Sequence, residues 1–186
     1  MRPCGASGRR CWFHNALSTL LMRTFLLTSA AAVLAGLSLV ASAAPPAKAA
    51  QASVIERGRY LVKIGGCNDC HTVNYGETGG KVPQAQWLTG SPLGWSGPWG
   101  TTYAPNLRNY FSRVTADQWV KVAHTIETRP PMPWFVLRDF SEPDLRAMHA
   151  FITSLGATGG ESPVYLPPGR KANGPVVLFP EPPPAK

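Results

Sequence analysis

The 186-residue sequence has few charged residues and few cysteines. Asp, Glu, Lys and Arg make up 15% of it, against about 25% in an ordinary globular domain. Four Cys in a chain of this length exclude a scaffold built from disulfides, and the absence of a glycine period excludes collagen. The 18 Gly and 19 Pro predict long loops, whereas 44% hydrophobic residues and six Trp are enough to bury a core.

Acidic residues are outnumbered by basic ones, 10 to 18, which gives a formal net charge of +8 at pH 7. The basic residues are scattered along the chain rather than clustered. The sequence therefore has no basic patch of the kind that binds nucleic acid, and no nucleic-acid partner is expected.

One segment without charges is long and apolar. Residues 25–43 read FLLTSAAAVLAGLSLVASA and are followed by Ala-Pro-Pro. The Ala-Ser-Ala ending is typical of a secretory signal peptide that is cleaved after Ala43, which predicts export to the periplasm. An uncleaved segment would instead anchor the chain, because its length nearly spans a hydrocarbon layer of roughly 30 Å. A signal of this kind ordinarily starts at a residue such as Met22, so residues 1–21 are interpreted as an upstream extension.

Cleavage after Ala43 would remove two of the four Cys and four Arg, and would leave a net charge of +4. The rest of the chain is then predicted to consist of a linker over 44–52, a domain over 53–160 and a Pro-rich tail over 161–186. The tail is expected to lie on the domain or to reach for a partner.

The two remaining cysteines belong to one motif, Cys67-Asn68-Asp69-Cys70-His71. Its CxxCH spacing is typical of haem attachment, since two thiols on one turn add to the two vinyl groups and the adjacent His becomes the proximal iron ligand. We therefore predict one covalently bound haem c, held by Cys67 and Cys70, with His71 on the iron.

Three other uses of this motif are open. A zinc site would need further Cys or His at short spacing, whereas His124 and His149 stand far away and singly. A thioredoxin-type pair would need a strand before the motif and a helix after it, whereas a helix and then a Gly-rich loop are expected. The third alternative is a plain disulfide between the two cysteines.

The second axial ligand of the iron must come from elsewhere in the chain, and the candidates are Met132, Met148, His124 and His149. Met132 lies in the segment RPPMPW, where three prolines exclude a helix interior and a rigid apolar loop can present the sulfur to a metal. Its alternative role is to fill a gap in the core. Met148 falls on the apolar face of an expected helix, and both histidines are interpreted as ordinary helix residues. Met132 is therefore the predicted ligand.

Three helices are predicted around the motif. The first covers 53–65 and leads into CxxCH, with Gly58 at a close approach to another helix. The second covers 115–127 and begins with a Thr–Gln capping box. The third covers 141–155, and its apolar face is expected to pack on the first helix with Phe151 beside Gly58.

Residues 74–112 are rich in Gly and Pro and show no strand of convincing length. They are expected to form an irregular wrap around a large flat ligand. Trp87, Trp99, Tyr103 and Arg108 are expected either to reach the haem or its propionates, or to pack in the core.

In this order of elements the chain resembles the monohaem class I cytochrome c domain over residues 53–156. The segments RGRYLVKIGGCNDCHT, TYAPNL, RPPMPW and SEPDLRAMHAFITSLG are also similar to the cytochrome c domains of electron-transferring subunits of bacterial periplasmic dehydrogenases, of the alcohol and gluconate types. Those subunits often carry three such motifs, and this chain has one. The resemblance implies an all-α fold, with cytochrome c-like helices wrapped around the haem and long irregular loops.

Iron that is bound by both His71 and Met132 has no open position for a substrate. The sequence thus predicts an electron carrier rather than an enzyme, with redox protein partners: a dehydrogenase as donor and a cytochrome or oxidase as acceptor. Membrane association would come through such a complex or through an uncleaved signal. The alternative function is a haem enzyme or small-ligand sensor, in which the sixth position is open or displaceable.

Overall fold

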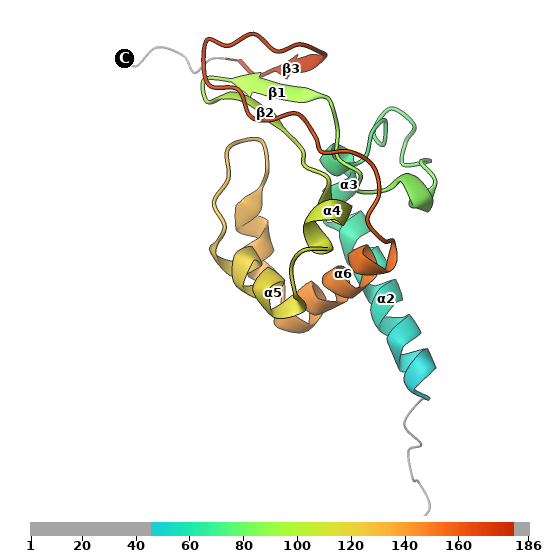
Figure 1. Ribbon diagram of the computed structural model, residues 1–186. Coiled ribbons are helices and arrows are strands. Elements are labelled where there is room, and N and C mark those ends of the chain that lie inside the picture. The colour runs from blue at the N-terminus through green and yellow to red at the C-terminus, as the bar shows by residue number, and fades with distance from the viewer. Residues whose placement is uncertain (1–45, 181–186) are drawn as a thin grey trace, which may run out of the picture. The chain divides into compact units, whose positions relative to one another are not determined.

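The computed structural model describes residues 46–180, so the predicted leader with its start at Met22, and the last residues of the tail, lie outside the described residues. The helices are α2 (Ala47–Ile64), α3 (Cys67–His71), α4 (Leu107–Phe111), α5 (Ala116–Thr125) and α6 (Glu142–Ser154), with 3-10 turns at Gln84–Gln86 and Trp134–Asp139. The strands are β1 (Gly94–Gly97), β2 (Gly100–Tyr103) and β3 (Val176–Leu178). Figure 1 shows the three strands together at one end of this part of the chain and the long helices at the other. Between residues 46 and 180, none of the helices combines the length and the apolar character needed to cross a membrane.

Helix α2 begins earlier than its capping signal predicted. Ser53 lies inside the helix, where its hydroxyl donates to the Ala50 carbonyl at 2.7 Å, and the helix starts directly after Pro46. The alanine-rich segment before Ser53 extends the helix because Ala has the highest helix propensity. The predicted end is confirmed within one residue, and Gly66 with φ of 69° then turns the chain into α3, a conformation that favours glycine.

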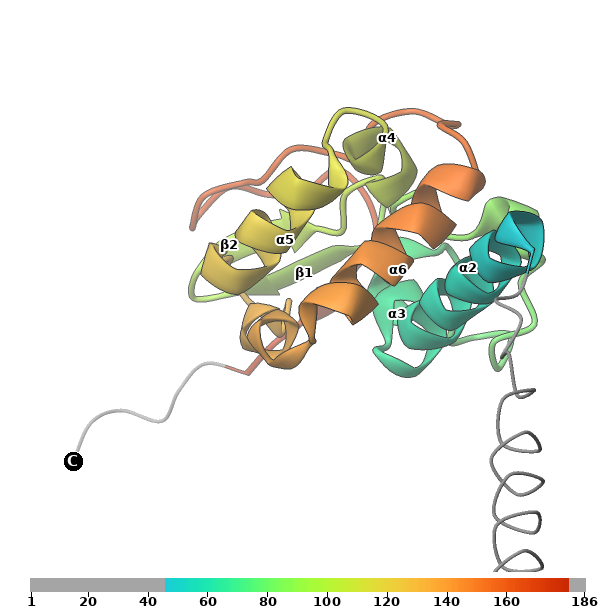
Figure 2. The same cartoon turned by 90° about the horizontal axis from the view of Figure 1, so that it is seen from below.

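The first and last helices of the domain, α2 and α6, pack side by side (Figure 2). The close approach predicted at Gly58 is confirmed, because a Cβ at this position would collide with the Ala147 carbonyl oxygen and lie 2.7 Å from Phe151 Cβ. Phe151, Leu145 and Ile152 of α6 are buried in the core. The two helices can therefore pack this closely only because Gly58 has no side chain.

Replacing Gly58 with Ala is expected to destabilise the domain by about 3 kcal/mol, because the added methyl group must push two packed backbones apart. Urea denaturation of the purified protein measures the free energy of unfolding. Gly76→Ala is the matched control, since a Cβ there meets nothing within 4 Å, and its effect should stay within about 1 kcal/mol. Equal stability of the two variants would contradict this account of the helix contact.

The other two predicted helices begin where their capping signals place them. Thr115 and Gln118 form the reciprocal capping box of α5, and the Ser141 hydroxyl accepts from the backbone N–H of Asp144 at the start of α6. The indole N–H of Trp119 donates to the Leu145 carbonyl at 3.0 Å and joins the two helices. Helix α5 thus packs against α6 on the side away from α2 (Figure 2).

No strand of convincing length was predicted for residues 74–112, and this prediction is wrong. Strands β1 and β2 pair antiparallel within that segment, and β3, from the Pro-rich tail, pairs parallel to β1 with Val176 opposite Gly94. Each strand has only three or four residues, and glycine occupies both ends of β1, so no alternating pattern could form. The all-α fold class itself stays a prediction.

Candidate functional site

One cavity of about 400 Å³ is lined by all four residues predicted to hold a haem: Cys67, Cys70, His71 and Met132. Its other walls come from the 94–103 hairpin, from α4, α5 and α6, and from the 134–139 turn. Most of these wall residues are apolar; they include Leu107, Phe111, Trp119, Val122, Ile126, Val136, Leu137, Phe140 and Ile152. The volume falls in the range of sites for organic ligands, which are concave and mostly apolar.

Helix α3, which carries the CxxCH motif, is held in place by a short chain of hydrogen bonds. The buried Asn68 side chain accepts from the Thr72 hydroxyl at 2.8 Å, and that hydroxyl accepts from the backbone N–H of Leu88 at 2.8 Å. The Gly90 N–H donates to the His71 carbonyl at 2.9 Å. The motif is therefore fixed to the 88–90 segment as well as to α2.

The imidazole of His71 is buried and oriented by one hydrogen bond. Its Nδ1 lies 2.8 Å from the Pro105 carbonyl oxygen, and because a carbonyl only accepts, Nδ1 carries the proton. Burial lowers the pKa of His71, although the bond to Pro105 opposes this. A neutral ring with a lone pair on Nε2 is the form that binds a metal.

Cys67 and Cys70 are not joined by a disulfide in this structure. Burial of the thiol raises the pKa of Cys67 to about 11, and burial also raises the pKa of Cys70. Within residues 46–180, His, Cys, Asp and Glu nowhere gather in a group of three that could hold a metal ion, as a zinc site would require.

The four candidates for the second axial ligand lie in different surroundings. Met132 lines the cavity and is partly buried against the core. Met148, predicted to be a core residue, is buried on α6, and it also lines the cavity. His124 is exposed on α5, and the His149 Nε2 lies 2.9 Å from the Val114 carbonyl; neither histidine lines the cavity.

Of the four residues expected to reach the ligand or to pack in the core, Tyr103 lines the cavity, whereas Trp87, Trp99 and Arg108 do not. Trp87 packs edge-on against Phe151 in the core, and Trp99 packs against Phe179.

The buried Arg108 guanidinium points to backbone carbonyls instead. Its Nη1 donates to Ala85 at 2.7 Å, its Nε to Gly156 at 2.6 Å, and its Nη2 to Leu155. Burial lowers the pKa of this group from its ordinary value. Arg108 thus connects α4 to the end of α6.

Several wall residues carried no sequence signal for a ligand site. Trp95 and Tyr110 lie outside any motif, and Tyr165 belongs to the Pro-rich tail. Pro105, which orients His71, stands in the segment TYAPNL, but an acceptor carbonyl is a property of every residue. Arg129 is the first residue of the segment RPPMPW, but only Met132 of that segment was predicted to face a ligand.

The residues of this cavity fit a covalently bound haem. Two free thiols, a neutral imidazole and a thioether line the same space, and the remaining wall is apolar. Thioether links need both thiols on one side of the ligand, and His with Met is a known axial pair for haem iron. No other part of the described chain brings this set of donors together.

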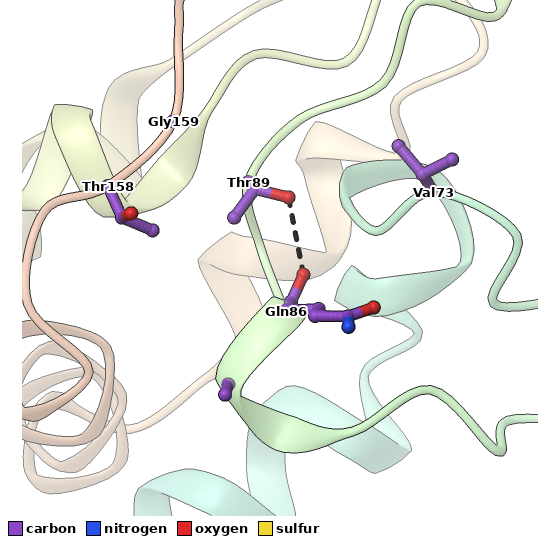
Figure 3. Close-up of a pocket in the computed structure, with 6 residues that line it drawn as sticks. Val73, Gln86, Thr89, Thr158 and Gly159 are labelled. Carbon is purple, nitrogen blue, oxygen red and sulfur yellow. Dashed lines mark hydrogen bonds between the residues drawn. The ribbon is translucent and has the colours of Figure 1, made fainter.

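A second, shallower pocket of about 370 Å³ lies elsewhere on the surface (Figure 3). It is lined by Val73, Ala85, Gln86, Thr89, Thr158 and Gly159. Within it the Thr89 hydroxyl donates to the Gln86 carbonyl at 3.2 Å. The residues that line this pocket include no titratable group and no sulfur.

Comparison with known proteins gives one curated relative. The chain is 30% identical over 123 residues to the protein described as "Alcohol dehydrogenase (quinone), cytochrome c subunit" of Gluconobacter oxydans (strain 621H). The match covers 62% of this chain and 24% of the relative, so the chain spans about a quarter of that protein's length. No protein-family model matches the chain, and no solved structure matches it. The similarity supports a cytochrome c-like relationship.

Proposed function

We propose that this protein is an exported c-type cytochrome that carries single electrons and is not itself an enzyme. The observation that carries the proposal is that Cys67, Cys70, His71 and Met132 line one apolar cavity. A single haem c bound there would supply reversible one-electron transfer between the ferric and ferrous states.

Each residue of the site has a distinct task under this proposal. Cys67 and Cys70 would bind the haem covalently, so that it does not dissociate after export. Pro105 keeps the proton of His71 on Nδ1, and this leaves Nε2 as the nitrogen that binds iron. Met132 would be the second residue to bind the iron, through its sulfur. The apolar walls exclude water, which contributes to the reduction potential.

The relative suggests the class of redox partner. Its name places it as the cytochrome c subunit of a quinone alcohol dehydrogenase, and we propose that this chain likewise takes electrons from a dehydrogenase and passes them to a cytochrome or oxidase. The predicted signal would export the chain to the periplasm, where it would meet an exported dehydrogenase.

Covalent haem attachment is the direct test of the proposal. Expression in bacteria that mature c-type cytochromes should give a periplasmic protein that begins at Ala44, carries one haem by mass spectrometry and stains for peroxidase activity on a denaturing gel. Replacing both Cys67 and Cys70 with Ala should abolish the stain, because both covalent links are lost. The matched control, His124→Ala, changes an exposed histidine outside the cavity and should stain like the wild type. Wild-type protein without covalently bound haem would overturn the proposal.

A further inference from the structure

The cavity wall carries one ionic side chain. Among the residues that line it, Arg129 alone is a Lys, Arg, Asp or Glu. Arg129 is exposed, so it stands where the cavity meets solvent. A lone cation at the edge of an apolar site is the feature that orients a ligand with an anionic group, because the apolar walls strengthen the attraction.

Two neighbouring segments hold Arg129 in place. The Arg129 guanidinium carbon lies 3.8 Å from the ring centroid of Tyr165, a cation–π contact, and the Tyr165 hydroxyl donates to the Trp99 carbonyl at 2.8 Å. On the other side, the Thr102 hydroxyl of β2 donates to the Pro130 carbonyl at 2.7 Å. The arginine is thus positioned by the hairpin and by the tail segment together.

Arg129 has no acidic partner among residues 46–180. The ion pairs of this part of the chain use other arginines, namely Arg57, Arg59, Arg113, Arg138 and Arg146. Its charge therefore remains available to a ligand.

We infer that Arg129, supported by Tyr165, pairs with a carboxylate of the haem and raises its reduction potential. The inference rests on the proposed function, which supplies the haem, and goes beyond it by naming the residue that receives the propionate. A carboxylate beside the iron favours the ferric state because that state carries the extra positive charge. The guanidinium offsets the carboxylate, so it favours the ferrous state.

The test is a redox titration of the haem-loaded protein. In Arg129→Gln the ratio of ferric to ferrous protein at a fixed solution potential should rise by about threefold or more, which corresponds to a midpoint about 30 mV lower. Arg129→Lys should restore part of the difference because it keeps the charge. Tyr165→Leu should give an intermediate value, since the arginine keeps its charge and loses its support.

The matched control is Lys81→Gln, which removes the same charge from an exposed position outside the cavity and should leave the midpoint unchanged. A midpoint for Arg129→Gln equal to that of Lys81→Gln would overturn the inference and leave the proposed function intact. Wild-type protein without covalent haem would overturn both.

Discussion

Replacing Met132 with Leu is expected to remove the iron–sulfur charge-transfer band from the spectrum of the oxidised, haem-loaded protein. Leu has a similar volume and no sulfur, so the apolar wall is kept and the sixth ligand is lost. The reduction potential should fall by about 100 mV, because a thioether stabilises the ferrous state and axial ligands set haem potentials over a wide range. Absorption spectra and a redox titration measure both effects.

Met148 supplies the matched control for this experiment. It lines the same cavity from α6 and is buried in the core. Met148→Leu therefore also replaces a thioether with an apolar side chain in the wall of the same cavity. We expect the band and the potential to persist in Met148→Leu. The reverse result, with the band lost only in Met148→Leu, would assign the ligand to α6 and show that the Met132 prediction is wrong.

The same spectra separate the carrier from its main alternative. A haem enzyme or small-ligand sensor would keep an open or displaceable sixth position, and Met132 would then only pack. Such a protein would show no iron–sulfur band in the wild type and no spectral change in Met132→Leu. It would also bind added cyanide or carbon monoxide as readily before the mutation as after it.

Replacing Arg108 with Met is expected to cost about 3 kcal/mol in the free energy of unfolding. The guanidinium donates to the carbonyls of Ala85, Leu155 and Gly156, and hydrogen bonds from a charged donor each contribute about 1.5–3 kcal/mol. Part of the loss is offset, because water can reach some of the freed carbonyls and because a buried cation no longer has to be desolvated. Urea denaturation of the haem-loaded protein measures the difference.

Two further variants keep this prediction testable. Arg113→Met removes an arginine of 64% side-chain exposure that pairs with Glu161 at 3.4 Å, and its cost should stay below about 1 kcal/mol. Arg108→Lys keeps the charge and loses the planar fork that reaches several carbonyls, so it should lie between the wild type and Arg108→Met. Equal losses of unfolding free energy in Arg108→Met and Arg113→Met would show that the hydrogen bonds of Arg108 to the end of α6 do not stabilise the domain.

The parts of the site that could be predicted are those whose chemistry is local in sequence. CxxCH is visible because one turn must place both thiols and the histidine together, and Met132 is visible because its neighbouring prolines exclude a helix. The helix starts at Thr115 and Ser141 were found for the same reason, since a cap and its partner lie three residues apart.

The parts that could not be predicted depend on contacts between distant segments. Arg108 was expected to face a ligand or the core, and only the fold shows that the end of α6 supplies its acceptors. Tyr165 lines the cavity, but a tyrosine in a Pro-rich tail has no sequence pattern that indicates which part of the domain it contacts. The short strands depend on pairing between the hairpin and the tail rather than on their own residues.

The contact between α2 and α6 also limits when the domain can close. These helices are the first and the last of the described domain, so the packing around Gly58 cannot form until α6 has been synthesised. During that interval the chain around Cys67 and Cys70 is not enclosed by the other walls of the cavity. If the protein is the exported cytochrome proposed above, this delay leaves both thiols accessible to the attachment reaction and makes final closure of the fold the later event.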